Sequence, residues 1–499
     1  MGEVKVAADI YIDKSNKRLT VVNKKELGQV FTPRWVAELI LDKLGYTLDN
    51  PELLSKKILE PSYGEGAFIY PILDRLVTAA SAAGKSNADI SQIIADNVWG
   101  IEYDEGLADK TTLSLNAYLS EQGIPEPKWN LYSQDSLTFT KPDFFDYVVG
   151  NPPYIRIHDM NEELRKNVKK FSHSSGNTDL YIIFFELALE WLNDKGQLGY
   201  ITPNSYMKNA SQGKFRKQIV EERLLKEIID FGGRPIFSDA ATYTAITILS
   251  KENKANREHV GYSFQNGVID YTAEVDYADL IAKPSAPLVF AAREDLDFLK
   301  ERQSRPVKIG DKTLPQHGIA TLRDKLYTSI PENVEPEVKR IAVKASTYKG
   351  AELNDYILFP YKEEDGVIKS LSEEELALYP NAYAYLLSHK EELITRDMDK
   401  GINWFQYGRS QGIVNTSKKK LVFSHVISAN QDTIKVFELP AGSIVYSGIF
   451  ITATEGSSLQ EIKEILESKE FCRYAKLCGK DMAGGFKALS IKALKDYGI

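Results

Sequence analysis

Short apolar runs alternate with amphipathic segments between Val30 and about Lys251. The runs are rich in Val and Ile, which is typical of strands, and the segments between them repeat at helical spacing. We predict helices at 36–44 and 179–192, and strands at 57–59, 97–101, 145–149, 197–201, 225–230 and 245–249. This alternation indicates an α/β fold with a doubly wound, mostly parallel sheet covered by helices on both faces.

The pattern changes after Ser250. Residues 251–256 are polar, and 283–287 form a Pro/Ser-containing stretch of the kind that joins domains. We predict three parts: an N-terminal extension at 1–23, an α/β domain at 24–282 and a second domain at 288–499. The last has short strand-like runs, aromatic patches and a helical region from Leu459 onward, so we expect a mixed α+β domain.

Composition is typical of a folded protein, with 43% hydrophobic and 26% charged residues. No run approaches the roughly 20 apolar residues of a membrane span, and the start of the chain lacks a signal-peptide pattern, so we expect a cytoplasmic protein. The two cysteines, Cys472 and Cys478, lie on one predicted helix, and the six histidines are scattered. We therefore predict no metal site.

The net charge of −8 argues mildly against a nucleic-acid partner, because neutralising phosphates requires clustered Lys and Arg. Local clusters matter more than the sum, and they occur at 165–170, 208–217 and 418–420. Each cluster is equally compatible with a solvated surface.

The first cofactor signal is a glycine turn. The predicted strand at 57–59 runs into Glu60, Pro61 and a turn where Gly64 and Gly66 permit positive φ and close approach of a ligand. Such turns are also common in proteins without a ligand, so further signals are needed.

Two acids supply those signals. Glu102 ends the next predicted strand, where its carboxylate can accept from both hydroxyls of a ribose, and Asp135, beside Ser136, is placed to accept from an adenine amine. The turn lacks the Gly-Lys-Ser/Thr ending of a phosphate loop. The sequence thus favours a nucleoside without a polyphosphate, which suits S-adenosylmethionine.

The candidate reacting centre is the segment Asn151, Pro152, Pro153 and Tyr154, directly after the predicted buried strand at 145–149. The prolines make the turn rigid and leave carbonyls unpaired by a helix. The Asn151 side-chain oxygen and the Pro152 carbonyl can each accept one N–H of an amine, so that its lone pair is directed at a methyl donor. Tyr154 would stack on a base that has left the duplex.

These residues resemble an amino-group DNA methyltransferase of the gamma class, the Taq-like adenine-N6 modification enzymes of restriction–modification systems. The resemblance implies a Rossmann-like S-adenosylmethionine-dependent domain at 24–282 and a DNA target-recognition domain at 288–499. It implies cofactor contacts from the matching positions Phe31, Thr32, Pro33, Glu60, Pro61, Gly64, Gly66, Glu102, Asp135, Ser136 and Asn151. It also implies that Asn151, Pro152, Pro153 and Tyr154 form the catalytic loop, and that Tyr243 is a second aromatic against the flipped base.

The second half fits a recognition domain more loosely. The segment 404–411 mixes aromatics with Arg409 and Gln411, which suit base edges or phosphates. We predict DNA contacts from these two residues and from Lys418, Lys419 and Lys420, although a core role is an open alternative for each. No Asp/Glu-x-Lys nuclease pattern stands on a convincing strand pair, so a cognate endonuclease would be encoded separately.

Three other functions stay open. An RNA or protein-glutamine methyltransferase can share the same loop, but the long second domain favours DNA. A subunit that kept the fold and lost catalysis is disfavoured because every catalytic position is present. A modification subunit that needs a separate specificity chain is disfavoured by the size of residues 288–499.

Overall fold

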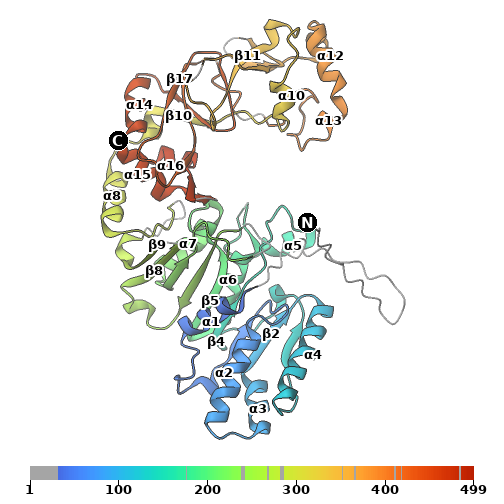
Figure 1. Cartoon of the computed structure of the whole chain (residues 1–499), viewed down its shortest axis with the longest axis vertical. Helices are drawn as coiled ribbons and strands as arrows, with labels where there is room; N and C mark the ends of the chain where they lie inside the picture. Colours follow the sequence, from blue (N-terminus) through green and yellow to red (C-terminus); the bar gives the residue numbers. More distant parts are fainter. Residues whose placement is uncertain are drawn as a thin grey trace, which may run out of the picture. The chain divides into compact units, whose positions relative to one another are not determined.

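The computed structural model describes residues 32–499, except 176, 238–241, 267–268, 281–285, 351, 365–366, 410–411, 417 and 483–484. The predicted extension at 1–23 lies outside the described residues, as do Phe31 and Gln411. The chain divides into two compact units, Met1–Leu288 and Val289–Ile499 (Figure 1). Each is described by itself below.

Unit 1 is built on a nine-stranded sheet in the order β3-β2-β1-β4-β5-β7-β6-β8-β9. The first five strands in that order are parallel, whereas β7 is antiparallel to both β5 and β6. The strands are β1 (Ile58–Glu60), β2 (Val98–Glu102), β3 (Asn130–Ser133), β4 (Phe145–Gly150), β5 (Leu192–Pro203), β6 (Leu225–Asp230), β7 (Thr244–Ser250), β8 (His259–Asn266) and β9 (Ile269–Asp276). The six predicted strands are all present, and β5 is longer than predicted.

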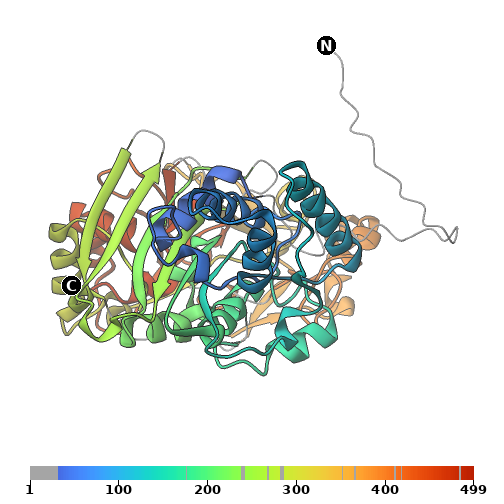
Figure 2. The ribbon, with the colours of Figure 1, turned by 90° about the horizontal axis from the view of Figure 1, so that it is seen from below.

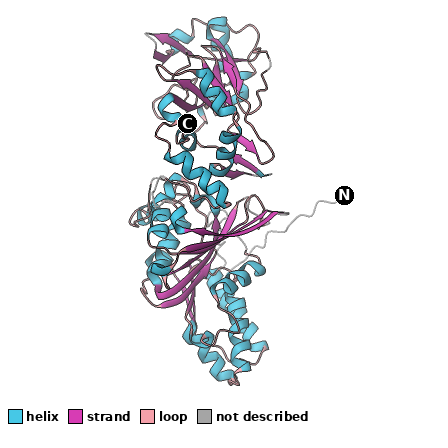
Figure 3. Ribbon diagram, turned by 90° about the vertical axis from the view of Figure 1, so that its left-hand side faces the viewer, coloured by secondary structure: helices cyan, strands magenta, loops and turns pink. Residues whose placement is uncertain are grey.

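Helices cover both faces of this sheet (Figure 3). Helices α1 to α4 contribute to one apolar core, while α6 packs on β4 and β5, where Phe185 contacts Tyr200 with ring centroids 5.3 Å apart. Helix α6 is mainly apolar because ten of its twelve residues are buried. The helices are α1 (Arg34–Leu44), α2 (Ile69–Ala82), α3 (Asn87–Asn97), α4 (Glu105–Glu121), α5 (Glu162–Val168), α6 (Leu180–Trp191) and α7 (Gly213–Glu221). The Rossmann-like α/β prediction is confirmed, including the helices predicted at 36–44 and 179–192.

The hairpin of β8 and β9 was not predicted from the sequence. It extends the sheet at the edge next to β6 (Figure 2). Val260 and Tyr262 are buried while His259 is exposed. Strand β8 thus mixes apolar and polar residues, and it comes directly after the polar stretch at 251–256. These two features made the strand hard to recognise in the sequence.

Unit 2 is a mixed α+β unit, as expected, and its described residues form four sheets. The four-stranded sheet has the order β10-β19-β15-β17, and the others are β12-β11-β18, β13-β14 and β16-β21-β20. The strands of unit 2 are β10 (Thr313–His317), β11 (Lys339–Lys344), β12 (Tyr356–Leu358), β13 (Tyr361–Glu364), β14 (Val367–Ser370), β15 (Lys420–Phe423), β16 (Val426–Ser428), β17 (Phe437–Leu439), β18 (Ile444–Tyr446), β19 (Ile449–Ala453), β20 (Lys480–Met482) and β21 (Phe486–Ala488).

The helices of unit 2 are α8 (Arg293–Ser304), α9 (Ile309–Lys312), α10 (Asp324–Thr328), α11 (Glu373–Leu376), α12 (Pro380–Ser388), α13 (Lys390–Ile394), α14 (Leu459–Glu467), α15 (Lys469–Cys478) and α16 (Ile491–Lys495). Both cysteines lie on α15, and both are buried. Among the described residues, no helix is long and apolar enough to cross a membrane.

Candidate active site

The predicted site residues of unit 1 meet at one edge of the sheet. Strands β3, β2, β1 and β4 are adjacent and parallel, so their carboxyl ends lie side by side. Glu60 ends β1, Glu102 ends β2, and Asn151 directly follows β4. Carboxyl ends of parallel strands are where ligands bind in open α/β sheets.

The glycine turn between β1 and α2 is held from two sides. The Gly64 N–H donates to Glu102 Oε2 at 2.9 Å, and Thr111 Oγ1 on α4 donates to the Gly64 carbonyl at 2.8 Å. Gly64 has φ +50° and Gly66 has φ +83°. A Cβ at Gly64 would meet nothing within 4 Å, so the turn has open space beside Gly64.

Two buried carboxyl groups line this turn. Burial raises the pKa of Glu60 well above its usual value, and nearby Glu102 adds to the rise, while the N–H groups of Phe68 and Ile69 oppose it. Burial also raises the pKa of Glu102, although it accepts from the N–H groups of Asp104 and Gly64. Glu60 Oε2 is buried without a hydrogen-bond partner among the described residues. A ligand with positive charge or hydroxyl donors would stabilise both carboxylates.

Asp135 and Ser136 lie beyond the end of β3. Asp135 Oδ1 accepts from the Leu137 N–H at 2.9 Å, and Ser136 Oγ donates to the Pro61 carbonyl at 2.6 Å. The hydroxyl of Ser136 is buried with its residue and braces the glycine turn. The hydrogen bond from Ser136 to the Pro61 carbonyl therefore helps to fix the backbone of the glycine turn.

The Asn151 loop is attached to two other predicted segments. Asn151 Nδ2 donates to Thr32 Oγ1 at 3.0 Å, and Ser62 Oγ donates to the Asn151 carbonyl at 3.4 Å. Gly150, with φ +156°, precedes the loop, and a Cβ there would lie 3.7 Å from Pro61 Cδ. Pro33 is the N-cap of α1. The structure thereby joins the N-terminal motif, the glycine turn and the Asn151 loop.

Tyr154 lies among other aromatic rings. Its ring centroid is 6.3 Å from that of Tyr181 and 6.4 Å from that of Phe237, both edge-to-face, and its hydroxyl donates to the Ile201 carbonyl at 3.2 Å. Phe237 immediately precedes the undescribed residues 238–241. The signal that could have found it is an aromatic six residues before Tyr243 in the same loop.

Tyr243 has a different described contact. Its carbonyl accepts from the Asn204 N–H at 2.9 Å, and no ring contact with Tyr154 is present among the described residues. Its role against the base stays a prediction.

The residues of unit 2 that were predicted to contact DNA differ in their exposure to solvent. Lys420 is only 1% exposed, its ammonium donates to the carbonyls of Thr416 and Ser443 at 2.8 and 2.6 Å, and burial lowers its pKa to about 8. The DNA contact predicted for Lys420 is therefore wrong, because its charged end is enclosed in the unit 2 core.

The remaining predicted contacts are accessible to different degrees. Lys418 and Lys419 are exposed, and Lys419 lies 3.5 Å from Glu438. Arg409 forms ion pairs with Asp397 at 2.6 Å and with Asp399 at 3.5 Å.

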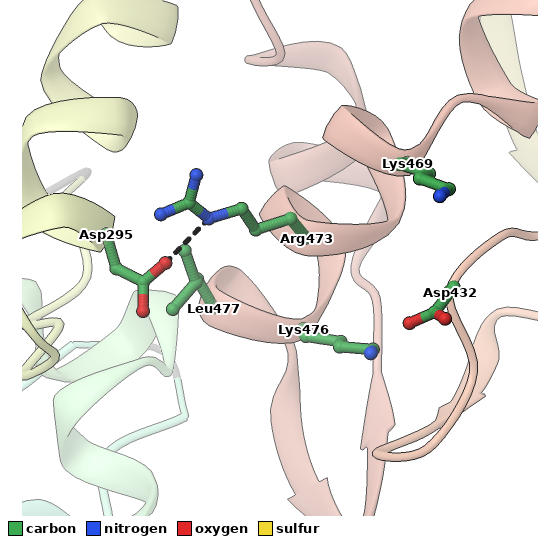
Figure 4. A pocket seen from close by; sticks show the side chains of 6 residues that line it. All are labelled: Asp295, Asp432, Lys469, Arg473, Lys476 and Leu477. Carbon is green, nitrogen blue, oxygen red and sulfur yellow. Dashed lines mark hydrogen bonds and ion pairs between the residues drawn. The ribbon is translucent and has the colours of Figure 1, made fainter.

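A surface pocket in unit 2 has a different character from the strand-end site (Figure 4). It is lined by Asp295, Asp432, Lys469, Arg473, Lys476 and Leu477. Arg473 Nε and Asp295 Oδ1 are 2.7 Å apart. Five of the six lining residues are charged, and none of them belongs to the predicted cofactor site.

The segment that contains most of the strand-end site is similar to a known protein family. Residues 79–237, which contain Glu102, Asp135 and the Asn151 loop, match the Eco57I restriction-modification methylase family. This segment, called the methylase segment below, is similar to that family. The methylase segment extends from α2 to Phe237, so it includes both the loop and the aromatic ring against Tyr154.

Relatives extend the match beyond the methylase segment. The type II methyltransferase M.XhoI of Xanthomonas vasicola is 28% identical over 413 residues, covering 75% of this chain and 73% of that protein. M.PaeR7I of Pseudomonas aeruginosa is 29% identical over 410 residues, covering 76% and 70%. The solved structure of the type IIL restriction-modification enzyme MmeI in complex with DNA covers 95% of this chain and 68% of that chain, with a TM-score of 0.66 and 14% identity. The MmeI match shows that the fold of both units is shared.

Proposed function

We propose that this protein is an S-adenosylmethionine-dependent DNA methyltransferase that methylates the N6 amine of adenine at a specific site. The observation that carries the proposal is the Asn151 loop at the end of β4, beside an acid-lined glycine turn at the ends of β1 and β2. The relatives named type II methyltransferases support DNA as the substrate.

The turn and its acids fit S-adenosylmethionine. The unpartnered, buried Glu60 Oε2 suits a ligand that brings positive charge, and Gly64 leaves room for it. Glu102 would hold the ribose and Asp135 the adenine amine, while Thr32, Pro33 and Phe31 are proposed on the methionine side. When bound, S-adenosylmethionine would supply an electrophilic sulfonium methyl group: the S–CH3 bond would break as the N6–CH3 bond forms, S-adenosylhomocysteine would leave, and the proton lost from N6 would pass to solvent.

The chain's own groups prepare the amine. The lone pair of adenine N6 is delocalised into the ring, so the amine is a weak nucleophile. The Asn151 side-chain oxygen and the Pro152 carbonyl would accept the two N–H bonds and direct the lone pair at the methyl group, while Pro153 keeps the turn rigid. This arrangement requires orientation rather than a strong base.

The target base has to leave the duplex to reach this loop. Tyr154 would stack on it, and Phe237, packed edge-to-face on Tyr154, is placed to hold that ring. Tyr243 is retained as the second aromatic that the resemblance implies.

Unit 2 is proposed as the target-recognition domain, with Arg409, Gln411, Lys418 and Lys419 as candidate contacts. We also propose a separately encoded endonuclease as a cognate partner, because the relatives above are named as methyltransferases of type II systems.

Genomic DNA from a methylation-free host that expresses this chain tests the proposal. Single-molecule sequencing would score N6-methyladenine and N4-methylcytosine in every sequence context, with Asn151→Ala as the matched control. N6-methyladenine at one short motif, absent from the control, is the expected result. Modified cytosine would overturn the choice of base.

The alternatives have their own outcomes. If DNA stayed unmodified while RNA or a glutamine side chain was methylated, the substrate would be RNA or protein and not DNA. Methylation that appears only after a second chain is co-expressed would assign recognition to a separate specificity subunit.

A further inference from the structure

The side chain of Asn151 is held by a residue far away in the sequence. Asn151 Nδ2 donates to Thr32 Oγ1 at 3.0 Å, across 119 positions of the chain. Thr32 is 5% exposed and lies just before Pro33, the N-cap of α1. The hydrogen bond therefore links the start of α1 to the end of β4.

This bond has a specific consequence because a carboxamide has two unlike ends. Its NH2 group only donates, and its oxygen only accepts. A target amine must donate its N–H bonds, so it needs the oxygen of Asn151. If the carboxamide rotated by half a turn, it would present donors to a donor and the amine would not be oriented.

Thr32 determines which end points to which side. Because Thr32 Oγ1 accepts from Nδ2, the nitrogen is directed toward the start of α1 and the oxygen is directed away from it. The backbone of Asn151 is held independently, since its carbonyl accepts from Ser62 Oγ and the preceding Gly150 packs beside Pro61. With the backbone held, rotation of the carboxamide is the freedom that Thr32 restricts.

We propose that Thr32 is a positioning residue that orients the carboxamide of Asn151 for methyl transfer. Its importance for the reaction rests on the proposed function. This role adds to the proposed place of Thr32 on the methionine side of the cofactor: through Asn151, its hydroxyl would act on the rate of methyl transfer more than on cofactor affinity.

Three variants separate these roles. Thr32→Val keeps the shape and removes the acceptor, whereas Thr32→Ser keeps the hydroxyl. Thr111→Val is the matched control, because Thr111 is also buried and its hydroxyl holds the Gly64 carbonyl of the glycine turn at 2.8 Å. Each variant would be measured for kcat on plasmid DNA and for affinity for S-adenosylhomocysteine by calorimetry.

We expect Thr32→Val to lower kcat about tenfold or more, as misorientation of a reacting group does, with cofactor affinity within about threefold of the parent. Thr32→Ser should restore most of kcat. Thr111→Val should show the opposite pattern, with weaker cofactor binding and kcat largely kept at saturating cofactor. An unchanged kcat in Thr32→Val, with or without weaker cofactor binding, would overturn the positioning role.

A second readout does not depend on methylation. Solvent exchange of the Asn151 carboxamide protons can be followed in ¹⁵N spectra of the full chain, with the signal assigned by its loss in Asn151→Ala. Exchange should be faster in Thr32→Val than in the parent and in Thr32→Ser; equal exchange in all three would refute the hydrogen bond. If the parent chain methylates neither DNA, RNA nor protein, the proposed function fails while this exchange still decides whether Thr32 holds Asn151.

Discussion

The sequence predicts a functional role for both the Asn151 loop and the lysine run 418–420. The residues of the first site lie together in the structure, whereas those of the lysine run do not. Around Asn151, residues from separate segments converge: Thr32 and Ser62 bind the same residue, and Glu102 binds the neighbouring glycine turn. In the lysine run, consecutive residues diverge: Lys418 and Lys419 are exposed, but Lys420 is buried.

The reason lies in the geometry behind each signal. Parallel strands bring their carboxyl ends to one edge, so chemistry that recurs at strand ends is gathered by the fold. A run of like charges has no such constraint. Lys420 is the first residue of β15, whose residues are all buried, so it is enclosed with its two carbonyl partners.

Asn151→Ala should have the largest effect on the converging region. Loss of the acceptor oxygen should lower methyl transfer by about a hundredfold or more, while S-adenosylhomocysteine affinity stays within a few-fold. Transfer of a labelled methyl group to plasmid DNA measures the first quantity and calorimetry the second. Near-normal transfer would show that the contacts around Asn151 stabilise the fold and do not serve methyl transfer.

The aromatic cluster offers the next test. Tyr154→Ala should lower kcat/KM by roughly 10- to 100-fold, because base stacking is worth about 1–3 kcal/mol. Tyr154→Phe should keep most activity, since it loses only the bond to the Ile201 carbonyl. A fluorescent adenine analogue at the target position would report flipping.

The same assay ranks Phe237 and Tyr243. We expect Phe237→Ala to reduce flipping more than Tyr243→Ala, because Phe237 contacts the Tyr154 ring. The reverse order would favour the assignment of Tyr243 from the family resemblance. Melting temperatures of both variants control for loss of folding.

Lys420→Ala tests the diverging region through stability. It removes a buried side chain and leaves two carbonyls without a donor, so we expect a loss of about 2–4 kcal/mol in the free energy of unfolding. A stable variant with weakened DNA binding would instead support the prediction that Lys420 contacts DNA.

The stability of Lys420→Ala relative to the parent should also depend on pH. The pKa of Lys420 is lowered to about 8 in the fold, below its ordinary 10.5. Between these values the unfolded chain binds the proton and the folded chain does not, so the parent gains stability from this group as pH rises. The stability gap between parent and variant should therefore widen from about pH 8 to 10.5, as measured by denaturant unfolding.

Changing the exposed lysines should have the smallest effect. Lys418→Gln with Lys419→Gln should weaken DNA binding a few-fold and reduce the slope of log affinity against log salt by up to about two, if both contact phosphates. An unchanged slope would remove them from the interface. The free energy of unfolding should barely change, because both side chains are exposed.

Sequence patterns predicted the α/β class and the six strands at 57–59 through 245–249, because strands buried inside the sheet leave short apolar runs between helices. They missed the β8–β9 hairpin, since a strand buried on one face mixes polar and apolar residues. They also selected the Asn151 loop, the glycine turn and Glu102, whose chemistry depends on local spacing.

Residue type and short-range spacing identify which residues carry chemistry at strand ends, because both limit what a turn can do. The folded chain adds the contacts between distant groups: Thr32 with Asn151, Phe237 with Tyr154, and Lys420 with carbonyls of its own core. These contacts depend on how strands and loops far apart in the chain pack together, and no local pattern encodes that.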